Sequence, residues 1–164
     1  MFRKMRRAAQ ELSDAENEAV LTKCTTGILS VLGDDGYPYG VPVNYVWKDG
    51  KIIFHGAKVG HKAEAIDEYD KVCFTVIEQD IVVAEELTDY YRSVILFGRA
   101  RRIQDESEIR SAAMWLGLKY DPDEAFVRDE IDLFMPKLAC FEIVPEHISG
   151  KQCKELVHKR DRRS

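Results

Sequence analysis

The sequence predicts a mainly β (α+β) protein in which an antiparallel barrel or sheet is packed against helices on its outside. Segments rich in β-branched and aromatic residues recur along the chain, and most are joined by hairpin turns. The 164 residues suffice for one domain with a hydrophobic core, and no repeat or low-complexity linker divides them. We therefore expect a single domain over residues 1–164, with residues 1–12 and 152–164 as flexible arms.

Helix starts are marked by hydroxyl or acidic side chains that precede helical runs. Ser13 and Glu16 have the spacing of a capping box, in which the side chain of each residue bonds the backbone N–H of the other. Acidic clusters beginning at Asp105 and Asp121 indicate two further starts, and Pro122 suits a first helical turn. The expected helices are residues 13–23, 61–68, 105–120 and a run from 122 onward.

Strands are expected wherever apolar, β-branched runs lie between turn residues. Asp49-Gly50 is a hairpin signal, and Gly98 indicates a bulge or bend inside a long strand. Pro42 predicts an edge or irregular position, because proline cannot donate a hydrogen bond to a neighbouring strand. Residues 79–90 are acidic and less regular, so we expect a loop there. The expected strands are residues 25–32, 39–47, 52–55, 71–77, 91–103 and 138–144.

The bulk composition favours a soluble, cytoplasmic protein. No apolar run approaches the roughly 18 residues of a transmembrane helix, and the N-terminus lacks the apolar segment of a signal peptide. The net charge of −5 conceals basic ends on an acidic body, which we interpret as solvated arms rather than a nucleic-acid interface. We expect no membrane, nucleic-acid or metal site, and reduced thiols at Cys24, Cys73, Cys140 and Cys153.

The stretch FHGAKVGHKAEAI, residues 54–66, leaves a strand and enters a helix. The first N–H groups of a helix are unpaired and carry partial positive charge, and Lys58, His61 and Lys62 add cationic side chains. Gly56 and Gly60 let backbone approach a ligand, so the stretch suits a phosphate although it has neither a P-loop nor a Rossmann pattern. An ordinary strand–helix connection with solvated lysines is the alternative that local composition leaves open.

Four segments together resemble the FMN-binding split-barrel proteins, in the branch of pyridoxamine 5′-phosphate oxidase-related proteins similar to the 5-nitroimidazole resistance (Nim) proteins. The segments are GYPYGVPVNYVWKDGKIIFHGAKVGHKAEAI, KVCFTVI, YRSVILFGRARRI and FEIVPEHISGK, in that order. The resemblance extends over roughly residues 5–151. It implies a six-stranded antiparallel split β-barrel with flanking helices, a homodimer, and one FMN in each interface site.

The resemblance also implies roles for individual residues. His61 and Lys62 fall where the family contacts the FMN phosphate, and Ser93 falls where it places a polar group near the flavin ring. His55 is the candidate catalytic residue, because an imidazole titrates near neutral pH and can supply a proton; a structural histidine is the alternative. The implied cofactor-binding residues are Val41, Pro42, Val43, Asn44, Phe54, His55, Gly56, His61, Lys62 and Ser93.

The function implied is that of an FMN-dependent oxidoreductase. It would pass electrons from a nicotinamide or another donor to a small organic acceptor, for example a nitroaromatic. Pyridoxal phosphate synthesis is not expected, because HISGKQCKELVHKRDRRS at the C-terminus does not match the segment with which pyridoxamine phosphate oxidases grip their substrate. The rival interpretation is a non-catalytic flavin- or haem-binding carrier or sensor, in which His55 would ligate iron. A deazaflavin is a further alternative cofactor.

Overall fold

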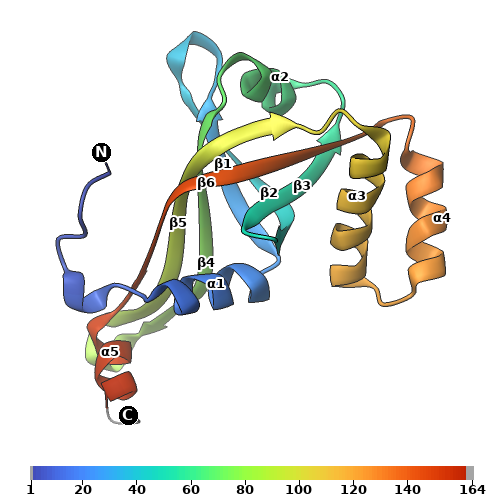
Figure 1. Ribbon diagram of the computed structural model, residues 1–164. Coiled ribbons are helices and arrows are strands. Elements are labelled where there is room, and N and C mark those ends of the chain that lie inside the picture. The colour runs from blue at the N-terminus through green and yellow to red at the C-terminus, as the bar shows by residue number, and fades with distance from the viewer. Residues whose placement is uncertain (1, 162–164) are drawn as a thin grey trace.

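A closed antiparallel barrel of six strands forms the centre of the protein (Figure 1). The computed structural model describes residues 2–161. The strands follow the order β1-β2-β3-β6-β5-β4 around the barrel, which confirms the predicted fold class. Their bounds are β1 (Thr26–Leu32), β2 (Pro38–Lys48), β3 (Lys51–Ala57), β4 (Lys71–Val83), β5 (Thr88–Arg102) and β6 (Leu138–Gln152).

Helices flank the barrel at its two ends and along one side (Figure 1). The α1 helix lies at one end and α2 at the other, while α3 and α4 form a helical hairpin beside the barrel. No helix in the described part of the chain has the length and apolarity needed to span a membrane. The helices are α1 (Asp14–Lys23), α2 (His61–Glu68), α3 (Glu106–Tyr120), α4 (Glu124–Phe134) and α5 (Lys154–Asp161), and short 3-10 turns lie at Ala8–Gln10, Asp34–Gly36 and Ala84–Glu86.

The helix starts follow the local chemistry of the sequence. The Ser13 hydroxyl accepts from the Glu16 amide, and the Glu16 carboxylate accepts from the Ser13 amide at 2.8 Å, so the predicted capping box is confirmed. Asp123 caps α4 through the amides of Ala125 and Phe126, which places Pro122 just before the helix rather than inside its first turn.

Two hydrophobic clusters hold the helices and strands together. The barrel interior is filled by large side chains, among them the stacked rings of Phe54 and Phe141 with centroids 5.2 Å apart. Strand alternation then turns Ile53 outward, where it packs against Leu116 of α3 and Ile131 of α4 in a second cluster. This second cluster fixes the α3–α4 hairpin against the outside of the barrel.

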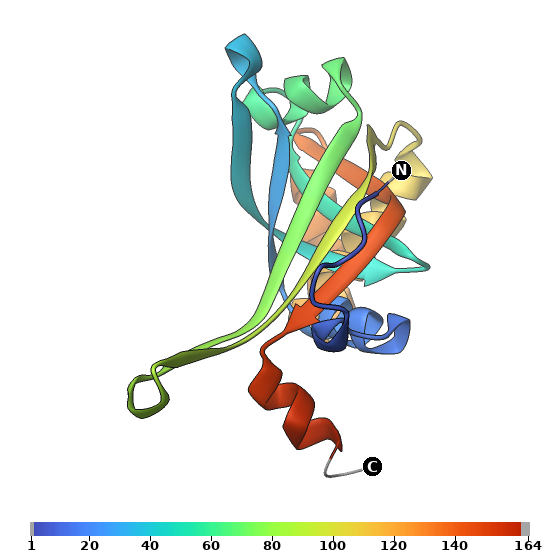
Figure 2. The same cartoon turned by 90° about the vertical axis from the view of Figure 1, so that its left-hand side faces the viewer.

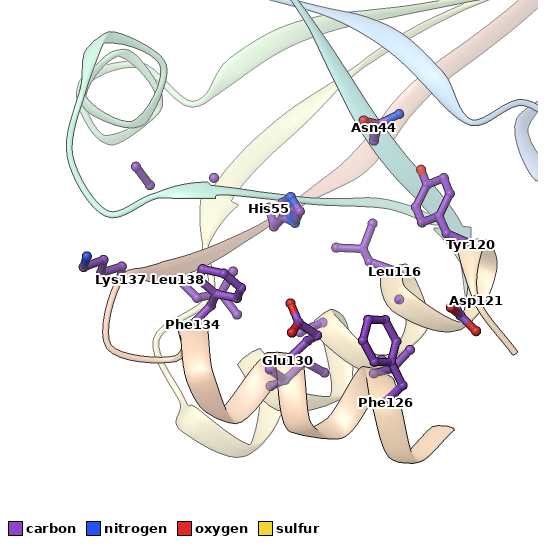
Figure 3. Close-up of a pocket in the computed structure, with 16 residues that line it drawn as sticks. Asn44, His55, Leu116, Tyr120, Asp121, Phe126, Glu130, Phe134, Lys137 and Leu138 are labelled. Carbon is purple, nitrogen blue, oxygen red and sulfur yellow. The ribbon is translucent and has the colours of Figure 1, made fainter. Parts of the chain in front are cut away.

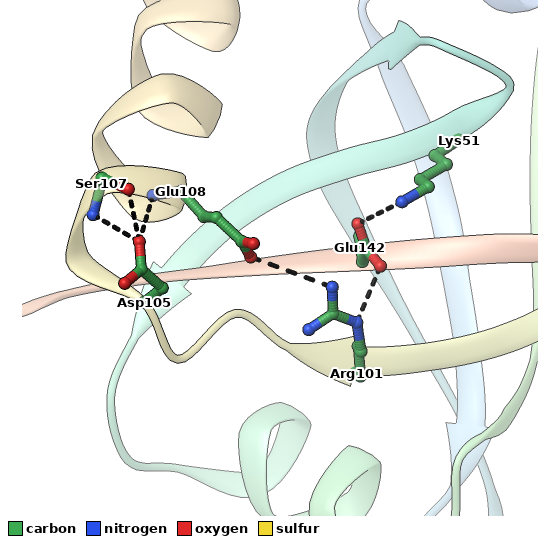
Figure 4. A network of polar contacts seen from close by, with 6 residues as sticks. All are labelled: Lys51, Arg101, Asp105, Ser107, Glu108 and Glu142. Atoms are coloured by element: carbon green, nitrogen blue, oxygen red, sulfur yellow. Dashed lines mark hydrogen bonds and ion pairs between the residues drawn. The ribbon is translucent and has the colours of Figure 1, made fainter.

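A polar network fixes the start of α3 to the barrel (Figure 4). The buried Glu142 carboxylate accepts from Lys51 at 3.0 Å and from Arg101 at 2.8 Å. Burial raises the pKa of Glu142, but the two hydrogen bonds outweigh burial and lower the pKa overall. Arg101 also lies 3.9 Å from Glu108 of α3, and Asp105 caps that helix through the amides of Ser107 and Glu108.

Although the strand order closes the barrel, β2 and β3 pair over only part of their length and separate at one end. Their ladder runs only from Lys48↔Lys51 to Tyr45↔Phe54, and beyond it β3 pairs with β6 alone. Pro42 lies in the separated part of β2, where the strand pairs on one side only, with β1. This agrees with the edge position that the proline predicts.

Residues 79–90, expected as a loop, instead form a hairpin that projects from the barrel (Figure 2). The ladder between β4 and β5 continues from Asp80↔Tyr91 to Val83↔Thr88, so the loop prediction was wrong. A two-stranded ribbon faces solvent on both sides, and acidic residues are therefore compatible with its strands. Composition alone does not distinguish such a ribbon from a loop.

The last strand is longer than the sequence indicated. β6 continues past Val144 and Pro145 and ends at Gln152. A bulge opposite Gly98 lets the pairing with β5 continue beyond Pro145. An added Cβ at Gly98 would lie 2.4 Å from the Val144 carbonyl oxygen, so only glycine fits this position without displacing backbone. An irregularity does occur at Gly98, as predicted, but the extra residue of the bulge is Glu146 of β6 and not a residue of β5.

The two segments expected as flexible arms contain regular structure where they are described. Gln10 and Leu12 are buried, and Glu11 pairs with Lys151 of β6 in an isolated bridge. Gln152 is also buried, and α5 follows it. Residues 10–12 and Gln152 therefore pack on the barrel, whereas α5 projects beyond its end (Figure 2). Met1 and residues 162–164 lie outside the described residues.

Candidate functional site

The candidate site begins where β2 and β3 separate. Val43 and Phe54 point into the barrel, where they are 8% and 0% exposed, so these two residues shape the strands from within. Asn44 and His55 lie just beyond Tyr45↔Phe54, the last pair of the ladder, and their side chains point to the outside of the barrel. The expected residues on β2 and β3 are thus divided between a buried inner row and an exposed outer row.

A groove of about 640 Å³ lies between the outside of β2–β3 and the α3–α4 hairpin (Figure 3). Asn44 and His55 form its strand side together with Gly56 and Ala57. Polar side chains of the helical side and its margins are Tyr120, Asp121, Glu130 and Lys137. Its apolar lining residues are Ala113, Leu116, Phe126, Val127, Ile131, Phe134 and Leu138.

Hydrogen bonds hold one end of the groove in place. The Asn44 amide donates to the Thr26 hydroxyl at 3.1 Å and to the Thr25 carbonyl at 3.3 Å. The Tyr120 hydroxyl donates to the same Thr25 carbonyl at 3.1 Å. The neighbouring Lys119 ammonium donates to backbone carbonyls of Cys24 and Tyr45, which ties the end of α3 to the barrel. These bonds fix the position of Asn44 and Tyr120 at this end of the groove.

His55 presents its imidazole to the groove from the end of β3. Partial burial lowers the pKa of His55 below its usual value of 6.5, and the positive charge of Lys62 lowers it further. The imidazole is therefore neutral at pH 7. In this form one ring nitrogen carries a hydrogen and the other accepts one.

A second cavity of about 250 Å³ lies at the start of α2, and we call it the α2 cavity. Ala57 lines both the α2 cavity and the groove, so the two are adjacent. The α2 cavity is lined by Tyr39, Val41, Ala57, Val59, Gly60, His61, Lys62 and Ala63.

Lys62 is the polar centre of the α2 cavity. Its ammonium lies 5.6 Å from the centre of the Phe54 ring and 2.9 Å from where a Cβ on Gly56 would be. Burial lowers the pKa of Lys62, and no carboxylate among the described residues pairs with it. A half-buried cation without a counter-ion has the chemistry to attract an anion, because pairing restores the stabilisation that burial removes.

His61 is less available to an anion than Lys62. Its ring stacks on Tyr39 with centroids 4.1 Å apart, and its Nε2 lies 3.8 Å from the Asp34 carboxylate. The Glu64 carboxylate accepts from the Gly60 amide at 2.9 Å, and the Ala63 and Glu64 amides donate to the Gly60 carbonyl. An anion at this helix start would therefore meet the amides of His61 and Lys62. The expected phosphate pair is thus brought to one cavity, with Lys62 better placed than His61.

Ser93 lies away from the groove on the barrel's outer surface. It pairs with Ile77 of β4, and Ile95 two residues later belongs to the cross-strand row Pro42–Ile28–Thr75–Ile95. Three strand spacings separate the ends of that row, or about 14 Å along the sheet. One chain therefore does not bring Ser93 to His55.

The surface between Ser93 and the groove is uncharged and uncovered, and we call it the bare face. Figure 2 shows β1 and β4 with no helix in front of them. Ile28, Ile77 and Ile95 are 39%, 54% and 38% exposed on this surface. The bare face comprises Ile28, Cys73, Thr75, Ile77 and Ile95.

Sequence reasoning missed the helical side of the groove. Phe126, Glu130 and Phe134 recur at four-residue spacing, which places them on one face of α4. This spacing was visible in the sequence, but it does not say what that face meets.

Comparison with known proteins relates most of the chain to one family. The sequence profile of the pyridoxamine 5′-phosphate oxidase family matches residues 13–152. A search of curated proteins found no match.

Solved structures share the fold at low sequence identity. A conserved hypothetical protein from Mycobacterium tuberculosis has a TM-score of 0.80 and 22% identity, covering 93% of this chain and 92% of that chain. A candidate 5-nitroimidazole antibiotic resistance protein from Bacteroides thetaiotaomicron has a TM-score of 0.71 and 19% identity, with 87% and 86% covered. An FAD and haem binding protein from Mycobacterium smegmatis has a TM-score of 0.72 and 18% identity, with 89% and 74% covered. At these identities the likeness concerns the fold alone.

Proposed function

We propose, from the premise that this chain belongs to the pyridoxamine 5′-phosphate oxidase family, that it binds FMN and passes electrons to a small organic acceptor. The observation that carries the proposal is Lys62, a half-buried cation without a carboxylate partner among the described residues, beside the groove that holds His55. The FMN phosphate would meet Lys62 in the α2 cavity. The flavin ring would lie along the strand side of the groove, near Asn44 and His55.

We propose FMN rather than FAD as the cofactor because of the charge on its phosphate. A terminal phosphate carries close to two negative charges at neutral pH, whereas each phosphate of a diphosphate linkage carries one. Lys62, the nearby His61 and the amides at the start of α2 suit the dianion better. FAD is the flavin with which FMN should be compared in binding experiments, because a protein of the same fold binds FAD and haem.

The protein's own groups position and protect the chemistry. A bound flavin supplies the exchange of electrons with a donor such as a nicotinamide and with an acceptor such as a nitroaromatic. Asn44 is held by Thr25 and Thr26 and so presents a fixed amide at the strand side. The apolar helical side would shield a ligand bound against it from water. His55 is the group that can hand a proton to an acceptor as it is reduced.

Replacing His55 by alanine should leave FMN bound but slow reoxidation by an organic acceptor about 100-fold or more, the usual contribution of a positioned acid. Reaction with oxygen should change less. The His55-dependent part of the rate should grow as the pH falls below 6.5, because only the protonated imidazole carries the extra proton and its pKa is lowered. Stopped-flow reoxidation of reduced protein measures these rates, with His158→Ala on α5 as the matched control. Equal rates for wild type and His55→Ala would favour a passive flavin carrier.

The bare face supports a homodimer as the working assembly. Uncharged side chains surround its exposed isoleucines, as in the centres of interfaces between identical subunits. Ser93 borders this face and lies away from the groove of its own chain. In the proposed dimer, Ser93 would instead lie near the flavin of the second chain. A cytoplasmic location is proposed from the four cysteines, all of which are free.

A haem-binding module is the second candidate. Its support is the haem-binding fold relative together with His55, whose neutral imidazole in an open groove is the form that ligates iron. Under this alternative, His55→Ala would abolish haem binding instead of changing a reoxidation rate.

A further inference from the structure

We propose that the α3–α4 side of the groove selects the organic substrate, admitting flat aromatic molecules with a positive or zero charge and rejecting anions. This inference rests on the proposed function, because it places the substrate beside a flavin bound on the strand side. Glu130 is the residue proposed to determine this specificity.

The helical side has the shape and surface of an aromatic binding wall. Phe126 and Phe134 are each 53% exposed although they are large apolar residues, and both line the groove. Leu116 of α3 and Leu138 extend the same apolar surface. Figure 3 shows the two rings and Glu130 rising from α4 toward His55 across the open space. An exposed aromatic ring in a groove favours a flat ligand, because stacking on the ring adds to burial.

The charges of the groove oppose an anion. The Glu130 carboxylate turns into the groove between the two rings, and no basic group among the described residues forms an ion pair with it. Asp121 adds a second carboxylate at one end, and Lys137 is the cation at the other. His55 on the strand side is neutral at pH 7 because its pKa is lowered. Lys62 lies in the α2 cavity, where the flavin phosphate would neutralise it.

An apolar wall with a central carboxylate distinguishes ligands by charge. A cationic ring against this wall would pair with Glu130 and would also gain cation–π contact with a neighbouring phenylalanine ring. A neutral ring would gain the apolar contact only. An anionic ring, or one bearing a phosphate, would meet Glu130 without a compensating cation at the centre. The groove is therefore unsuited to phosphorylated amines such as pyridoxamine 5′-phosphate.

Three probes of the same shape test the inference: 1-methylquinolinium, quinoline and quinoline-2-carboxylate, titrated by calorimetry into FMN-loaded protein at pH 7.5 and low salt. We expect the cation to bind about twofold to fivefold more tightly than quinoline, the range of a partly exposed ion pair. The carboxylate should bind more weakly than quinoline by a similar factor. Added salt should reduce both differences.

Matched variants separate charge from shape. Glu130→Gln should remove the preference for the cation and leave the affinity for quinoline unchanged, whereas Asp129→Asn, one residue away and outside the groove lining, should change neither. Phe134→Ala should weaken all three probes, while Leu133→Ala, 68% exposed and outside the lining, should weaken none.

The results separate this inference from the proposed function. Flavin-loaded protein that binds the three probes equally, or Glu130→Gln that behaves like Asp129→Asn, would overturn the charge selection. Probes that bind only flavin-free protein would place the flavin ring itself against α3–α4, which also overturns it. If the protein binds no flavin, the proposed function fails by itself, and the same titrations on the flavin-free protein still decide whether Glu130 sets a charge preference.

Discussion

Replacing Lys62 by alanine weakens FMN binding by about 1–3 kcal/mol and weakens riboflavin binding much less. The reason is that the Lys62 ammonium is half-buried in the α2 cavity with no carboxylate partner among the described residues, and riboflavin lacks the phosphate that would pair with it. Fluorescence titration of the two flavins against wild type and Lys62→Ala measures the difference directly.

Lys58→Ala is the matched control for this substitution. Lys58 is an exposed lysine four residues earlier whose side chain does not line the α2 cavity, so its loss should leave both flavin affinities nearly unchanged. An equal loss of FMN and riboflavin affinity in Lys62→Ala would show that this lysine acts through the fold and not on a phosphate.

Placing a carboxylate on the bare face turns the expected dimer into a monomer. In Ile77→Glu, a two-fold contact would bury two unpaired carboxylates, so we expect the dissociation constant to rise about 100-fold or more. Ile77 is 54% exposed in the single chain, and the substitution should therefore leave the barrel folded. Multi-angle light scattering gives the mass, and circular dichroism verifies the fold.

Tyr37→Glu provides the comparison, because Tyr37 is 75% exposed in the connection between β1 and β2, away from the bare face. This variant should remain a dimer. A wild-type protein that is a monomer at all concentrations and still binds FMN tightly would refute the shared assembly.

Local chemistry explains why much of the fold was predictable. The Asp49-Gly50 turn needs two residues in the left-handed region, and both have positive φ, 51° and 75°. The capping box at Ser13 likewise depends on neighbours in sequence. The hairpin at residues 79–90 and the extension of β6 beyond Pro145 were missed because pairing with a distant strand, not local composition, stabilises them.

The candidate site divides in the same way. His55 and Lys62 stand out in the sequence because a strand end followed by a helix start is a local pattern. The meeting of Glu130 with the groove depends on how the α3–α4 hairpin packs on Ile53, which no local signal encodes. Ser93 is a third case, since its expected role near a flavin requires a second chain that one sequence does not describe.

The absorption spectrum of the purified protein, recorded after FMN is added and the unbound excess removed, tests the central claim most directly. The account predicts that flavin bands remain with the protein in proportion to its concentration, and that Lys62→Ala retains less FMN than Lys58→Ala does. A protein that retains neither FMN nor FAD, or one that is purified with a Soret band and no flavin, would contradict it.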